Sequence, residues 1–132
     1  MENHQKRFLI ADDEEGIRHL LKMVLSKKYA GSTIDESENG QDFLEKARSA
    51  RLSAPYTLYL LDQRMPAVKG YDALTALRSE GDTTPAVLFT GTGFDINESA
   101  LPNAFRLLSK PCTAQEVLAT IEDLLHEESK SF

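Results

Sequence analysis

Short apolar runs alternate along this chain with stretches whose apolar residues recur at helical spacing. This alternation is typical of a parallel sheet with helices on both faces. We therefore expect an α/β fold with a doubly wound, five-stranded parallel sheet. The run at 56–61 has no polar alternation, which indicates a strand buried on both faces at the sheet centre. The other expected strands are residues 7–11, 32–37, 86–89 and 106–109.

Four of the expected helices carry a clear apolar stripe. The first runs through residue 28, the second follows Asn39-Gly40, and the third follows a loop at 65–70. The last follows Thr113 and Glu116, whose spacing is that of a capping box. The stripes are formed by Ile17, Leu20, Leu21, Val24 and Leu25; Phe43, Leu44 and Ala47; Tyr71, Leu74 and Leu77; and Val117, Leu118, Ile121, Leu124 and Leu125.

The segment 96–104 is expected to form the remaining helix, but Pro102 interrupts it. Proline removes a backbone donor and clashes with the preceding turn, so this fourth helix should be short or distorted. The 132 residues fit one domain over 1–132, with a core at about 7–127 and a short, frayed tail at 128–132.

Composition excludes several classes of function. The formal charge of -6 and the pI near 5.0 argue against a nucleic-acid-binding surface, which needs clustered Lys and Arg. Protein and small phosphorylated partners are expected instead. Cys112 has no second cysteine to pair with, and no apolar run approaches the ~20 residues of a membrane helix. We expect a cytoplasmic protein without membrane insertion.

Three carboxylates follow two of the expected strands. Asp12 and Asp13 follow the first strand, and Asp62 follows the third. The carboxyl ends of parallel strands meet at one edge of the sheet, so these groups should converge. Converging carboxylates repel and stay ionised around a cation, and an oxygen-only set favours Mg²⁺. Asp13 and Asp62 can ligate the ion directly, Asp12 can hold a bound water, and a backbone carbonyl just after Asp62 can complete the shell.

Thr90 and Lys110 follow the fourth and fifth strands and should reach the same edge. With a metal ion present, Asp62 is a possible nucleophile toward a phosphoryl group. The Thr90 hydroxyl and the Lys110 ammonium can take the remaining phosphoryl oxygens. We also expect a cis Lys110-Pro111 bond that aims the lysine inward. Taken singly, each of these residues is more often a helix cap, a turn residue or a surface charge, and their order along the chain carries the prediction.

At these residues the chain resembles the receiver domain of two-component response regulators. The matching motifs, spread over about residues 7–127, are Leu9-Ile10-Ala11-Asp12-Asp13-Glu14, Asn39-Gly40, Leu60-Leu61-Asp62 with Met65-Pro66 and Gly70, Leu88-Phe89-Thr90-Gly91, and Ser109-Lys110-Pro111. The resemblance implies a flavodoxin-like fold and a signalling domain that catalyses its own phosphorylation and dephosphorylation, rather than a classical enzyme.

The resemblance also implies the roles of individual residues. Asp62 would accept a phosphoryl group from a phosphohistidine on a histidine kinase or a histidine phosphotransfer protein. Mg²⁺ would be held by Asp13, Asp62 and the backbone carbonyl of Arg64, with Asp12 assisting. The signal would then pass to an unidentified downstream protein through protein–protein contacts.

The chain departs from the usual receiver pattern at several positions. Leu107 stands three residues before Lys110, where many receivers carry a switch aromatic. Gln63 and Arg64 follow the expected acceptor in place of smaller or apolar residues, and Lys69 stands where an acidic or small residue is common. The output surface is therefore expected to differ from that of better-known relatives.

Two other readings compete with a phosphorylatable receiver. A pseudo-receiver would bind partners without phosphorylation, but the acidic positions and the lysine are all present. A phosphatase of the haloacid dehalogenase type would need a second aspartate two residues after its nucleophile, and Arg64 occupies that place. The phosphorylatable receiver is therefore favoured.

Overall fold

The computed structural model describes residues 5–91 and 105–130, with side chains described as far as residue 127. Its strands form one parallel sheet in the order β2-β1-β3-β4-β5. The strands are β1 (Arg7–Ala11), β2 (Thr33–Ser37), β3 (Leu58–Asp62), β4 (Ala86–Thr90) and β5 (Phe105–Ser109). The expected five-stranded, doubly wound α/β fold is therefore confirmed.

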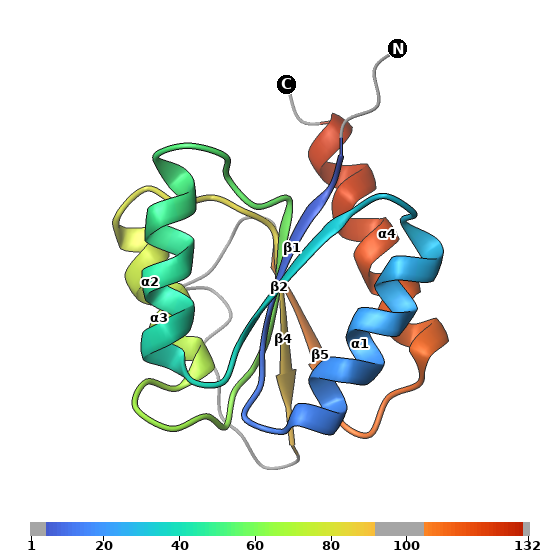
Figure 1. The fold of residues 1–132 in the computed structure, drawn as a ribbon, viewed down its shortest axis with the longest axis horizontal. Coiled ribbons are helices and arrows are strands. Elements are labelled where there is room, and N and C mark those ends of the chain that lie inside the picture. Colours follow the sequence, from blue (N-terminus) through green and yellow to red (C-terminus); the bar gives the residue numbers. More distant parts are fainter. Residues whose placement is uncertain (1–4, 92–104, 131–132) are drawn as a thin grey trace.

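Helices cover both faces of this sheet. Those in the described residues are α1 (Glu15–Lys28), α2 (Gly40–Arg51), α3 (Gly70–Ser79) and α4 (Ala114–Lys130). Helices α2 and α3 lie on one face, and α1 and α4 lie on the other (Figure 1). The helix expected at 96–104 lies outside the described residues.

The C-terminal helix is longer than the sequence pattern indicated. The expected tail at 128–132 was wrong for its first residues, because α4 continues to Lys130. The apolar stripe ends at Leu125, but no proline or glycine follows it within the helix. Glu and Lys are good helix formers, so the backbone hydrogen bonds continue beyond the last packed turn.

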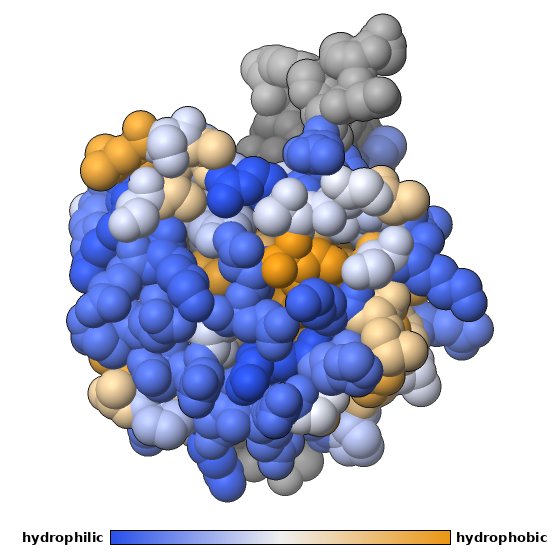
Figure 2. All heavy atoms as spheres, in the orientation of Figure 1, coloured by the Kyte–Doolittle hydropathy of each residue, from blue (hydrophilic) through white to orange (hydrophobic). Residues whose placement is uncertain are grey.

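Burial follows the position of each strand in the sheet. All five residues of β3 are buried, as are all five of β4, whereas the edge strand β2 is buried only at Ser37. The predicted central place of 56–61 is confirmed, and β2 lies at one edge of the sheet. Hydrophilic residues dominate the face of the molecule drawn in Figure 2, where apolar atoms show only in small areas.

The alternating side chains of the buried strands form two separate cores. One core lies under α2 and α3 and includes Leu9, Phe43, Tyr59, Leu61 and Leu74. The other lies under α1 and α4 and includes Phe8, Leu25, Leu60, Val87 and Ile121. No helix in the described part of the chain is both long enough and apolar enough to cross a membrane.

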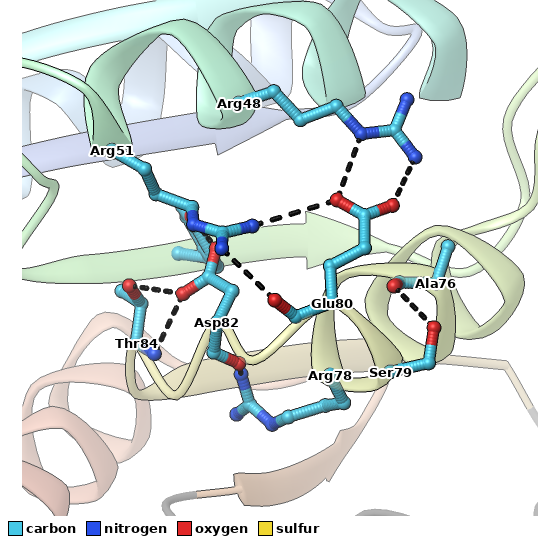
Figure 3. Close-up of polar contacts among 9 residues, drawn as sticks. Arg48, Arg51, Ala76, Arg78, Ser79, Glu80, Asp82 and Thr84 are labelled. Carbon is cyan, nitrogen blue, oxygen red and sulfur yellow. Dashed lines mark hydrogen bonds and ion pairs between the residues drawn. The ribbon is translucent and has the colours of Figure 1, made fainter.

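A polar network joins the last turn of α2, the end of α3 and the segment that precedes β4 (Figure 3). Glu80 bridges Arg48 and Arg51, with the Arg48 Nη2 to Glu80 Oε2 distance at 2.5 Å. The buried Asp82 accepts hydrogen bonds from the Thr84 hydroxyl and from the Tyr59 hydroxyl, the latter at 2.6 Å. These contacts join the ends of α2 and α3 to the sheet.

Candidate phosphoryl and metal site

Asp12, Asp13 and Asp62 meet at the carboxyl ends of β1 and β3. These strands are parallel neighbours, with Ala11 paired to Leu61, so the residues that follow reach the same edge. One carboxylate oxygen of each aspartate lies within 4.8 Å of the other two. Asp12 is 2% and Asp62 5% exposed, while Asp13 faces solvent. The sequence prediction that these three groups converge is confirmed.

The electrostatics of the cluster are unfavourable without a counter-ion. Burial raises the pKa of Asp12 from 3.8 to about 6; the Glu14 backbone N–H, which donates to Asp12 Oδ1 at 2.9 Å, opposes this rise. The nearby Asp62 charge raises this pKa further. A hard divalent cation would remove both penalties, and the three groups offer only oxygen ligands. The donor set therefore fits Mg²⁺.

Lys110 points into the same cluster. Its Nζ lies 2.6 Å from Asp62 Oδ1 and 3.8 Å from Asp12 Oδ2. Burial alone would lower the pKa of Lys110, but the hydrogen bond to Asp62 and the attraction of both carboxylates raise it above its ordinary value. The Lys110-Pro111 bond is cis, as predicted. The ammonium is therefore charged and directed at Asp62.

Thr90 ends β4 and is 4% exposed at the same edge of the sheet. Its carbonyl accepts a hydrogen bond from the Lys110 backbone N–H at 2.7 Å, which fixes the start of the loop that carries the lysine. Arg64 lies two residues after Asp62 with an exposed side chain. The phosphoryl-binding role of Thr90 and the ligand role of the Arg64 carbonyl stay predictions.

Gln63 has a structural role that the sequence did not reveal. Its buried side chain accepts a hydrogen bond from the Tyr71 backbone N–H at 2.6 Å, and its carbonyl accepts one from Gly70 at 3.1 Å. Both donors lie in the first turn of α3, which has no other side-chain cap. Gln63 therefore ties the start of α3 to the end of β3, next to Asp62. The sequence offered one indication of this role, because Gln63 is a polar residue directly after the buried run of β3.

The loop after β3 is held against the start of α2. Gly40 donates its N–H to the Pro66 carbonyl at 3.3 Å, and a Cβ at Gly40 would lie 1.9 Å from the Val68 carbonyl oxygen. Within this loop Ala67 adopts a φ of 71°, in the left-handed region. The close approach to α2 and the strained alanine show that tertiary contacts fix this loop, which follows Asp62 directly.

An apolar groove of about 520 Å³ lies beside the carboxylates, between α1 and the loop after β5. Lys110 lines this groove as well as facing Asp62, so the groove and the acidic cluster share a wall. Leu20, which is 53% exposed, also lines it. The apolar wall is completed by Ile17, Leu21, Val24, Pro111 and Val117.

The amino-acid sequence of this chain matches a known protein family. The family model described as the response regulator receiver domain matches residues 8–122 of the chain. The chain belongs to this receiver family. It is therefore a signal-transduction domain of the two-component type rather than a classical enzyme, and response regulators interact with histidine kinases.

Individual receivers resemble this chain at the level of sequence and of fold. The two-component response regulator ORR41 of Oryza sativa subsp. japonica is 33% identical over 113 residues, which cover 84% of this chain and 87% of that protein. The transcriptional regulatory protein ResD of Bacillus subtilis (strain 168) is 32% identical over 133 residues, or 98% of this chain. The chain spans about half of ResD, 52% of its length.

A solved receiver supports the fold assignment. The crystal structure of a CheY-like response regulator receiver domain protein from Methanospirillum hungatei JF-1 superposes with a TM-score of 0.80 at 22% identity. The match covers 98% of this chain and 100% of that one.

Proposed function

We propose that Asp62 accepts a phosphoryl group from a phosphohistidine on a histidine kinase or a histidine phosphotransfer protein, in a reaction that depends on Mg²⁺. The observation that carries this proposal is the 2.6 Å contact between Lys110 Nζ and Asp62 Oδ1 within the cluster of three aspartates. A buried carboxylate at a strand end, paired with the Lys110 ammonium and flanked by two more carboxylates, supports a role for Asp62 in attack on phosphorus.

The metal would be held by Asp13, Asp62 and the backbone carbonyl of Arg64, with Asp12 assisting. When bound, Mg²⁺ would offset the repulsion between these carboxylates and the anionic phosphoryl group. Asp12 is the most deeply buried of the three, and burial, together with the neighbouring Asp62 charge, raises its pKa.

In the proposed transfer, an Asp62 oxygen forms a bond to phosphorus while the bond from phosphorus to the imidazole nitrogen breaks. The imidazole leaves with the bonding electron pair and is protonated by solvent. The Lys110 ammonium, which pairs with Asp62 in the resting site, moves its contact to a phosphoryl oxygen. The Thr90 hydroxyl binds another oxygen, so the charge of the transition state is shared between two strand ends.

We propose that the donor histidine approaches over the groove that shares Lys110 with the acidic cluster. Exposed apolar residues such as Leu20 line this groove, and Glu14 and Lys110 stand at its polar side. We propose that a helix of the phosphohistidine protein contacts this surface during transfer. The phosphorylated receiver would then act on a downstream protein through protein–protein contacts.

The proposal is tested with acetyl phosphate as donor and intact-mass spectrometry as readout. We expect one phosphoryl adduct in the presence of Mg²⁺, none after chelation, and none in Asp62→Asn. Asp72→Asn removes an exposed carboxylate from α3 and should be phosphorylated normally. An adduct that persists in Asp62→Asn would refute the assignment, and the absence of any adduct in the unmodified protein would favour a pseudo-receiver.

A further inference from the structure

Arg18 contacts the backbone of the acidic cluster without belonging to it. From α1, its Nη1 donates to the carbonyl oxygen of Asp12 at 2.7 Å, and its Nε donates to Glu36 Oε1 at 3.0 Å. The Arg18 side chain is only 12% exposed. The guanidinium thus joins the end of β1 to the edge strand β2, using two different donors in a fixed geometry.

Glu36 holds this guanidinium in place. Its second carboxylate oxygen lies 3.3 Å from Lys22 Nζ. Burial alone would raise the pKa of Glu36, but the bonds from Arg18 and Lys22 lower it below its ordinary value. Glu36 is therefore ionised, and it neutralises Arg18 locally. A neutralised guanidinium can bind a carbonyl beside the carboxylates with little repulsion toward a cation bound there.

Asp12 is held by three hydrogen bonds, of which the one from Arg18 is the third. The Asp12 N–H donates to the Ser37 carbonyl at 3.1 Å, and its side-chain Oδ1 accepts from the Glu14 N–H at 2.9 Å. Arg18 holds the carbonyl, which is part of the peptide leading to Asp13. The orientation of this peptide determines the direction in which the Asp13 side chain points from the end of β1.

We propose that Arg18, held by Glu36, is a positioning residue of the metal site: it fixes the Asp12–Asp13 peptide so that the three carboxylates meet around one divalent cation. This inference rests on the Mg²⁺ site of the proposed function. It does not depend on Asp62 being the phosphoacceptor. Partners that orient metal ligands typically change metal affinity 10- to 100-fold when they are removed, roughly the effect expected here.

The test measures Mg²⁺ affinity directly by isothermal titration calorimetry, with urea unfolding as a separate readout of stability. Arg18→Ala should weaken Mg²⁺ binding by about tenfold or more. Arg18→Lys should recover part of this loss, because it keeps a cationic hydrogen-bond donor at this position. Lys22→Ala is the matched control: it removes another cation from Glu36, does not touch Asp12, and should leave Mg²⁺ affinity within about twofold.

Glu36→Gln provides a second variant that keeps the shape of the side chain and removes the charge that holds Arg18. It should weaken Mg²⁺ binding in the same direction as Arg18→Ala, by a smaller factor. Unchanged Mg²⁺ affinity in folded Arg18→Ala and Glu36→Gln would overturn the positioning role and leave the proposed function standing. Loss of affinity in both variants, together with failure of acetyl phosphate and Mg²⁺ to phosphorylate the unmodified protein, would support the positioning role and refute the acceptor role of Asp62.

Discussion

Gly70 lies directly against the backbone of Asp62. A Cβ at Gly70 would stand 2.4 Å from the Asp62 carbonyl oxygen and 2.8 Å from a methyl carbon of Leu88. The first residue of α3 must therefore lack a side chain for the helix to start this close to the candidate acceptor.

Gly70→Ala should lower the free energy of unfolding, because the added methyl group forces α3 away from β3. Overpacking of this kind costs about 1–3 kcal/mol, measured by urea unfolding. Gly16→Ala is the control, since a Cβ at Gly16 in α1 meets nothing within 4 Å and alanine is the better helix former. Equal stability of Gly70→Ala and the unmodified protein would contradict the close packing.

Ala67→Gly should stabilise the protein. Ala67 has a φ of 71°, which costs an alanine about 1–2 kcal/mol, whereas glycine adopts it without strain. The greater freedom of glycine in the unfolded chain offsets part of this gain, so we expect a net stabilisation of about 0.5–1 kcal/mol by urea unfolding. Ala76→Gly, within α3, should have the opposite sign. A loss of stability in both variants would show that Ala67 is not strained.

Without divalent ions, the contribution of Asp12 to stability should fall as the pH rises from about 4 to about 7. The pKa of Asp12 is about 6 in the folded state and 3.8 as a free group, so the folded state binds more protons across this interval. The contribution of this group therefore decreases with rising pH, by up to about 3 kcal/mol. In Asp12→Asn this component is absent, and the stability difference between the two proteins should change over this interval. If the difference in free energy of unfolding between the two proteins stays constant with pH, the pKa of Asp12 is not raised in the folded state.

Arg64→Ala should speed loss of the phosphoryl group without changing Mg²⁺ affinity. Arg64 follows Asp62 by two residues and is exposed, so its bulk can crowd the path of the attacking water. We expect decay after donor removal to accelerate about two- to tenfold, which corresponds to about 0.4–1.4 kcal/mol in the barrier. Lys69→Ala removes another exposed cation from the same loop and serves as the control. An equal or slower decay in Arg64→Ala would show that Arg64 does not shield the acyl phosphate.

The parts of this protein that sequence predicts best are those governed by topology. The apolar run that became β3 predicted the central strand, because burial on both faces removes polar alternation. Once the strands are parallel, residues at their carboxyl ends must share one edge. The meeting of Asp12, Asp13 and Asp62, and the approach of Lys110 to Asp62, followed from that rule.

Contacts that depend on side-chain paths between elements were not predictable. The sequence marks Gln63 only as an unusual residue after Asp62. Its hydrogen bond to the Tyr71 backbone could not be predicted, because it depends on where α3 packs against β3. The bond from Arg18 to Asp12 likewise depends on Glu36, which reaches Arg18 from the neighbouring strand β2. The C-terminal end of α4 was missed because the apolar stripe stops before the helix does.

The acceptor role of Asp62 is tested most directly by chemical trapping. Borohydride reduces an aspartyl phosphate to homoserine, so peptide mapping by mass spectrometry locates the acceptor residue. After treatment with acetyl phosphate and Mg²⁺, we expect homoserine at position 62 and unmodified aspartate at positions 12 and 13. Homoserine at another position, or unmodified Asp62 in protein that carries the phosphoryl group, would contradict the proposed function.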